Sequence, residues 1–120
     1  MTKETLGGRV RRARVEAGFG LRELARRLEK TPSYLSDIEN DRRVPSEPVL
    51  RDLSRQLPVE FDELMSLAGR FGEDAERYLR KSPAAAKLFR RISASRLGEK
   101  DLDELLQRAE QLGRKRGTKR

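Results

Sequence analysis

The stretch from residue 31 to residue 43 holds many side chains that can donate or accept a hydrogen bond or carry a positive charge. Only Leu35 and Ile38 fit an inward stripe of a short helix there, and hydroxyl, carboxylate, amide and guanidinium groups fill most of the other positions. Core packing alone explains such a helix poorly. We therefore interpret the stretch as a surface for hydrogen bonding and charge recognition.

Catalytic chemistry lacks its usual side chains in this sequence. The chain has no His and no Cys, which removes the commonest general base, the commonest zinc ligands and the thiol nucleophile. No Gly-rich phosphate loop is present, and the carboxylates are interleaved with Arg or Lys as surface pairs. We expect a protein that is not an enzyme and that uses no cofactor and no metal.

Size and charge limit the class further. The 120 residues suffice for one compact domain and some extra helices, and 40% of them are charged against 35% apolar. The net charge of +8 favours a polyanionic partner, but residues 1–70 hold 14 basic against 12 acidic residues and the excess is concentrated in residues 113–120. We expect this tail to be disordered, and its basic residues fit either a solubilising end or a contact with phosphates.

Apolar residues recur at helical spacing along almost the whole chain, so we expect an all-α fold. A first helix is predicted from about Glu4 to Ala17, where Gly18 favours a helix end. A second follows from Leu21 to Leu28. Thr31 and Pro32 mark a third helix that runs to Glu39 or Asn40, because the Thr hydroxyl can cap free backbone N–H groups and Pro fits the first turn.

Further helical patterns occupy the rest of the chain. Ser46 is expected to cap a fourth helix, and Pro58 to end it before a fifth helix closes a bundle near residue 68. Glycines at 69–72 indicate a linker, after which three more helical patterns follow. The apolar positions predicted for these last five helices are Val49, Leu50, Leu53, Leu57, Phe61, Leu64, Leu67, Ala68, Ala75, Tyr78, Leu79, Leu88, Phe89, Ile92, Leu102, Leu105, Leu106, Ala109 and Leu112. Of these, Leu88, Phe89 and Ile92 are expected to face inward.

Two runs, Gly18–Leu28 and Pro32–Asn40, together with Arg42, Arg43 and Pro45-Ser46, resemble the lambda-repressor/Cro-like helix-turn-helix family, also called the XRE type. The resemblance covers roughly residues 5–68. The positions in register are Leu24-Ala25, Tyr34-Leu35-Ser36, Ile38-Glu39 and Pro45-Ser46. The resemblance implies a five-helix DNA-binding domain, which we place over residues 1–69. The helical patterns and the charge after it predict a C-terminal helical dimerisation or partner-binding region over 70–112 and the basic tail over 113–120.

Within that family the third helix enters the major groove of duplex DNA, where base edges present distinguishable donors and acceptors. Carried over by position, the resemblance places Thr31, Pro32, Ser33 and Asp37 toward base edges and Tyr34 near the groove wall. Ser33 and Asp37 are the strongest candidates, although Asp37 could instead pair with a nearby Arg and Tyr34 could be a packing residue. The candidates for phosphate contacts, each of whose basic members could also be a solvated surface charge, are Arg22, Arg26, Lys30, Asn40, Arg42 and Arg43.

Three positions depart from the family pattern. Leu21 stands where the family commonly has a Gln that braces a phosphate. Glu29 and Asp41 stand where it usually has Gly, so both residues could need a left-handed backbone. Asp tolerates that conformation better than Glu. Glu39 is expected to be structural rather than to face the DNA.

The C-terminal helices cannot bury their apolar faces alone. Packing on the first bundle, packing on each other and dimerisation are all open, as is binding of a toxin or of a metallopeptidase, since regulators similar to this one also occur as antitoxins or peptidase-controlled repressors. The dimerisation candidates are Leu88, Phe89, Ile92, Leu102, Leu105, Leu106 and Leu112.

These observations favour a sequence-specific regulator of transcription that binds double-stranded DNA, most simply a dimeric repressor of a palindromic operator.

Two other classes of partner fit the sequence less well. RNA binding would use exposed aromatic residues, yet most of the six aromatic side chains fall on inward helical faces. No apolar run could span a bilayer or serve as a signal peptide, so we expect a cytoplasmic protein with no membrane partner.

Overall fold

The computed structural model describes residues 4–117. Over that range the chain forms eight helices and no strand, which confirms the all-α prediction. The chain divides into two compact units, one ending at Ala75 and the other beginning at Glu76. The division falls inside the sixth helix rather than at the glycines near residue 69.

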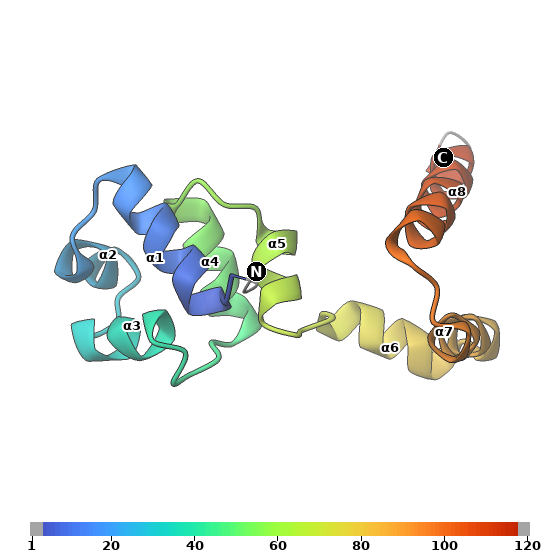
Figure 1. Cartoon of the computed structure of the whole chain (residues 1–120), viewed down its shortest axis with the longest axis horizontal. Helices are drawn as coiled ribbons and strands as arrows, with labels where there is room; N and C mark the ends of the chain where they lie inside the picture. Colours follow the sequence, from blue (N-terminus) through green and yellow to red (C-terminus); the bar gives the residue numbers. More distant parts are fainter. Residues whose placement is uncertain (1–3, 118–120) are drawn as a thin grey trace. The chain divides into compact units, whose positions relative to one another are not determined.

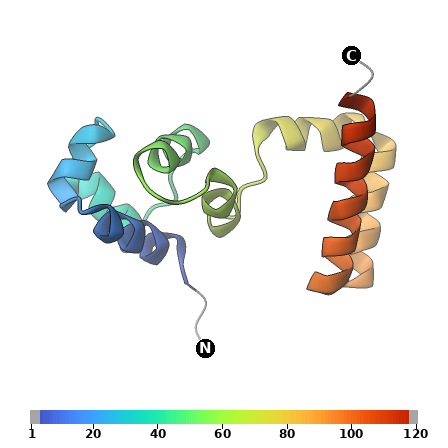
Figure 2. The ribbon, with the colours of Figure 1, turned by 90° about the horizontal axis from the view of Figure 1, so that it is seen from above.

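The first unit holds helices α1 (Leu6–Ala17), α2 (Leu21–Arg27), α3 (Pro32–Glu39), α4 (Glu47–Gln56) and α5 (Phe61–Leu67). Helix α3 packs against both α1 and α2, and α4 packs against α5. Figures 1 and 2 show these two groups side by side in the first unit. The arrangement leaves one face of α3 directed away from the bundle.

A single hydrophobic core holds the first unit together. The predicted face of α4 is confirmed, because Val49, Leu50, Leu53 and Leu57 are all buried. The remaining buried apolar side chains are Leu6, Val10, Ala13, Leu24, Ala25, Leu28, Leu35, Ile38, Val59, Leu64 and Met65. Burial of such side chains supplies most of the stability of a domain of this size, so α3 is anchored chiefly through Leu35 and Ile38.

Local signals set the helix boundaries. Gly18 ends α1 with a left-handed backbone at φ 80°, which glycine adopts at no steric cost. Ser46 occupies the expected N-cap of α4, but its hydroxyl makes no capping hydrogen bond, so that part of the prediction is wrong. Glu47 supplies a negative charge in the first turn of α4, where it interacts favourably with the positive end of the helix dipole.

Helix α6 (Glu73–Lys81) leads into the second unit, which contains α7 (Pro83–Ser95) and α8 (Glu99–Gly117). None of these three helices has a buried residue. The expectation that Leu88 and Phe89 point inward is wrong within a single chain, since their exposed fractions are 57% and 50%. The periodic pattern thus predicted the helices correctly but not their burial.

The basic tail differs from expectation. It was predicted to be disordered from Gly113 onward, but α8 continues through Gly117. Three cations in its last turn, Arg114, Lys115 and Arg116, are favourable at the negative end of the helix dipole. Residues 118–120 of the expected tail lie outside the described residues.

No helix in the described part of the chain combines the length and the apolar character that a membrane span requires.

Candidate nucleic-acid interface

A tight turn joins α2 to α3. Glu29 has a left-handed backbone at φ 56°, and the N–H of Lys30 donates to the carbonyl of Ala25 at 2.9 Å, which closes the turn. The Thr31 hydroxyl then accepts a hydrogen bond of 3.0 Å from the N–H of Tyr34, which confirms the predicted cap of α3. These contacts fix where α3 begins.

The five candidates for base reading all lie at the start or along the outer side of α3. Thr31 and Ser33 are exposed, whereas Pro32, Tyr34 and Asp37 are partly buried. Because Ser33 and Asp37 are four residues apart, they share one face of the helix. That face presents a hydroxyl, which donates and accepts, beside a carboxylate, which only accepts.

Asp37 already has a partner within the protein. Its Oδ1 lies 3.6 Å from a terminal nitrogen of Arg42, whose side chain remains 70% exposed. An exposed ion pair of this kind is weak, so a stronger donor can compete for the carboxylate. The geometry accommodates both interpretations of Asp37, as an acceptor for a base and as the partner of an Arg.

The candidates for phosphate contacts fall into two groups. Arg22, Lys30 and Arg43 are exposed around the α2–α3 pair. Arg26, Asn40 and Arg42 are exposed too but have partners within the protein. Asn40 donates to the Ser36 carbonyl at 2.8 Å and accepts from Arg11 at 3.2 Å, so its amide also fastens the end of α3.

Glu23 holds two cations at the outer side of α2. Its carboxylate lies 2.6 Å from Arg26 and 3.1 Å from Arg27. Hydrogen bonds from Arg26 and then Arg27 hold the pKa of Glu23 below its ordinary value. Glu23 therefore stays negatively charged at neutral pH and offsets part of the positive charge on this helix.

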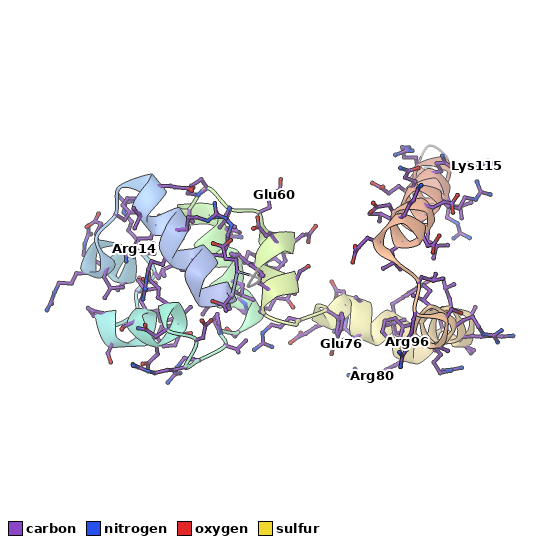
Figure 3. The ribbon with its side chains drawn as sticks, in the orientation of Figure 1. Arg14, Glu60, Glu76, Arg80, Arg96 and Lys115 are labelled. Carbon is purple, nitrogen blue, oxygen red and sulfur yellow. The ribbon has the colours of Figure 1, made fainter. Side chains whose placement is uncertain are left out.

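A buried ion pair that the sequence reasoning missed joins α3 to α1. Glu39 is 4% exposed, and its carboxylate accepts two hydrogen bonds from Arg14, at 2.7 and 3.0 Å. Arg11 adds a third, longer contact at 3.3 Å. The hydrogen bond to Glu39 raises the pKa of Arg14, and Figure 3 labels Arg14 on the inner side of α1. The structural role expected for Glu39 is confirmed.

The loop after α3 is attached to the start of α1. Asp41 has a left-handed backbone at φ 58°, and its carboxylate accepts from the N–H of Gly7 at 2.9 Å and from the Thr5 hydroxyl at 2.7 Å. A Cβ at Gly7 would lie 2.5 Å from the carbonyl oxygens of Ile38 and Glu39. A glycine inside a helix is unfavourable, so Gly7 was the sequence signal for this close approach.

The dimerisation candidates remain accessible in the second unit. Ile92 and Leu102 are partly buried, and the exposed fractions of the others lie between 38% and 58%: Leu88, Phe89, Leu105, Leu106 and Leu112. Scattered apolar side chains are common on protein surfaces, but a row along one helix is a feature of interaction sites. The side chains of α8 stand out around the ribbon in Figure 3.

The chain has recognisable relatives. A family model described as a helix-turn-helix domain matches residues 7–81. The transcriptional regulator ClgR of Mycobacterium tuberculosis is 30% identical over 95 residues, which are 79% of this chain and 85% of ClgR. The HTH-type transcriptional regulator RamB of the same organism is 42% identical over 60 residues, which are half of this chain but only 13% of RamB. This chain therefore spans a small part of the length of RamB.

Among solved structures, the complex of the SinR and SinI proteins contains a chain that is 27% identical, with a TM-score of 0.49. The match covers 91% of this chain and 98% of that one.

Proposed function

Because the chain belongs to the XRE-type helix-turn-helix family of DNA-binding transcriptional regulators, we propose that it is a dimeric repressor that reads a palindromic operator through α3. The observation that carries the proposal is the outward face of α3, where Ser33 and Asp37 lie one turn apart. Side chains of these types can discriminate base pairs in the major groove.

The attachment of α3 supports a reading role. Its beginning is fixed by the Thr31 cap, and its end by Glu39 and Asp41, each bonded to α1. A helix held at both ends keeps its outer side chains in one orientation, which reduces the entropy lost on binding. Exposed cations on both sides of α3 then supply the phosphate contacts that set its register.

The DNA-binding part of the proposal is tested by fluorescence anisotropy with labelled duplex DNA over a range of salt concentrations. Each phosphate contact changes the slope of log affinity against log salt by about 0.9. We expect a steep negative slope for duplex DNA and weaker binding of an RNA duplex of the same sequence, whose deep major groove excludes a helix. Equal affinity for the two duplexes would contradict readout through α3.

We further propose that α8 supplies the dimer contact. Four of its leucines form a row, at positions 102, 105, 106 and 112. The acidic and basic residues of the same helix are concentrated in different halves. Residues 99–106 contain four acidic residues and one basic residue, whereas residues 107–117 contain four basic and one acidic. Two copies packed antiparallel would place opposite charges together, and two parallel copies would place like charges together. The partner we propose is therefore a second, antiparallel copy.

Two variants distinguish a dimer contact made by the leucine row from a general effect of added charge on α8. Leu105→Glu should convert a sedimenting dimer into a monomer, whereas Gln107→Glu adds the same charge on the opposite side of the helix and should leave the dimer intact. Because the chain has no native Cys, disulfide formation between introduced cysteines can report the relative orientation of the two α8 helices in the dimer. Mixed Asp101→Cys and Lys115→Cys chains should form the mixed disulfide if the helices are antiparallel. A wild-type monomer would instead favour a different protein partner for this face.

We propose repression rather than activation because occupying an operator blocks a promoter directly and requires nothing beyond DNA binding. The proposed site of action is the cytoplasm, where such a regulator meets its DNA.

A further inference from the structure

Two cations that flank α3 in the sequence meet on one aromatic ring. The Nζ atom of Lys30 lies 5.4 Å from the centroid of the Tyr34 ring, and the Cζ atom of Arg43 lies 4.9 Å from it. Lys30 belongs to the turn before α3, whereas Arg43 belongs to the loop after it. One ring therefore gathers positive charge from both ends of the helix.

The Tyr34 ring is itself held in place. It is partly buried and packs against the hydrophobic core of the first unit. The backbone N–H of Tyr34 donates to the Thr31 hydroxyl at 3.0 Å, which fixes this residue in the first turn of α3. A ring fixed by core packing gives two long, flexible side chains a defined place to rest.

The contact that each cation makes within the protein determines whether its N–H groups remain available to bind a phosphate. Arg26 and Arg42 lie against carboxylates, at 2.6 and 3.6 Å, which take up part of their charge and donors. A guanidinium over a ring face interacts with the π electrons and keeps its in-plane N–H groups for other acceptors. Arg43 is thus positioned without its capacity for a phosphate being used.

Building on the proposed function, we propose that Tyr34 is a positioning residue for DNA binding. Its ring holds Lys30 and Arg43 where they contact phosphates beside the groove that α3 enters, and Tyr34 itself reads no base. This assigns Tyr34 a different role from the groove-wall and packing roles expected from the sequence. It also gives the role an energetic basis, since both side chains lose less freedom when DNA binds.

The test measures the affinity of the full chain by anisotropy on two duplexes, one rich in A·T pairs and one rich in G·C pairs. Tyr34→Leu removes the ring and should weaken binding to both duplexes by about five- to thirty-fold, as the cost of ordering two long side chains on binding predicts. Tyr34→Phe keeps the ring and should bind like the wild type. In a Lys30→Ala, Arg43→Ala background, Tyr34→Leu should cost no further affinity.

Each other outcome overturns the inference in a different way. A loss that is the same with and without Lys30 and Arg43 would show a structural role only. A loss confined to one duplex would show base reading, and a loss in Tyr34→Phe would show that the hydroxyl binds the DNA. If circular dichroism shows that Tyr34→Leu is unfolded, Tyr34→Met provides a second ringless variant.

The same data separate this inference from the function on which it rests. Failure of the wild type to bind either duplex would remove the proposed function. Normal wild-type binding with an unaffected Tyr34→Leu variant would remove only the role of Tyr34.

Discussion

The Nε atom of Arg14 lies 2.7 Å from Oε2 of Glu39, and the side chain of Glu39 is only 2% exposed. A second guanidinium nitrogen of Arg14 bonds the other carboxylate oxygen at 3.0 Å, so the pair is bidentate. It connects the last turn of α1 to the last residue of α3. The direction in which α3 presents its outer face therefore depends on an ion pair inside the protein.

Removing this carboxylate should destabilise the first unit strongly. Glu39→Ala leaves the largely buried guanidinium of Arg14 without its partner, and we expect the free energy of unfolding to fall by about 3 kcal/mol. Denaturant titration followed by circular dichroism measures this change. The matched control is Asp52→Ala, which breaks the exposed pair with Arg55 and should cost less than about 1 kcal/mol. Equal losses in the two variants would refute the importance of the buried pair.

Gly7 and Gly8 are neighbours in α1 and should respond differently to the same substitution. Gly7→Ala forces a Cβ against two backbone carbonyls, so we expect a loss of more than about 2 kcal/mol in unfolding free energy. Gly8→Ala meets a side-chain hydroxyl at 3.3 Å and gains helix propensity, so its stability should stay within about 1 kcal/mol of wild type. Thermal and denaturant unfolding of both variants checks the difference, and a stable Gly7→Ala protein would argue against close packing of α1 on α3.

Ser33 and Arg43 should separate sequence reading from phosphate binding. Arg43→Ala should weaken binding to every duplex and reduce the salt slope by about 1. Ser33→Ala should relax the preference at particular base pairs and leave the salt slope unchanged. Binding is measured on a panel of duplexes that differ at single positions. An equal effect of Ser33→Ala on all of them would remove Ser33 from the reading surface.

Glu23 is expected to oppose DNA binding. Glu23→Gln removes a negative charge beside Arg26 and Arg27, and we expect affinity for all duplexes to rise about two- to five-fold at low salt. Asp52→Asn removes one negative charge from α4 and is the control for net charge alone. A matching rise in affinity in that variant would contradict the local effect.

The ion pairs of Glu23 also make stability depend on pH. Since the pKa of Glu23 is lowered, the stability from its pairs is present above the ordinary Glu pKa and is lost only as pH falls through the lowered value.

Much of the first unit could be predicted because its signals are local. Thr31-Pro32 specifies a helix start whatever surrounds it, and Gly18 specifies a helix end. The left-handed backbones at Glu29 and Asp41 also followed from their positions in the family pattern. Each of these depends on a few neighbouring residues, and sequence reports such neighbours directly.

Contacts between distant residues could not be predicted in the same way. Arg14 and Glu39 are 25 residues apart, and each alone has the character of a surface charge. Asp41 was identified as a departure at a loop position, but nothing near it indicates that its carboxylate bonds to Gly7. Periodicity also identified an apolar face on α8 without indicating what covers it, because a single helix pattern does not specify its partner.

Sequence-specific reading by a dimer is best measured by selection from random duplex DNA with the full-length protein at near-physiological salt, together with sedimentation of the free protein. A dimeric repressor that reads DNA through α3 should enrich a palindrome whose half-sites lie about one helical turn apart. Recovery of DNA without any motif would contradict this expectation, because the protein would then be only a basic helical binder and its exposed C-terminal face would point to a protein partner.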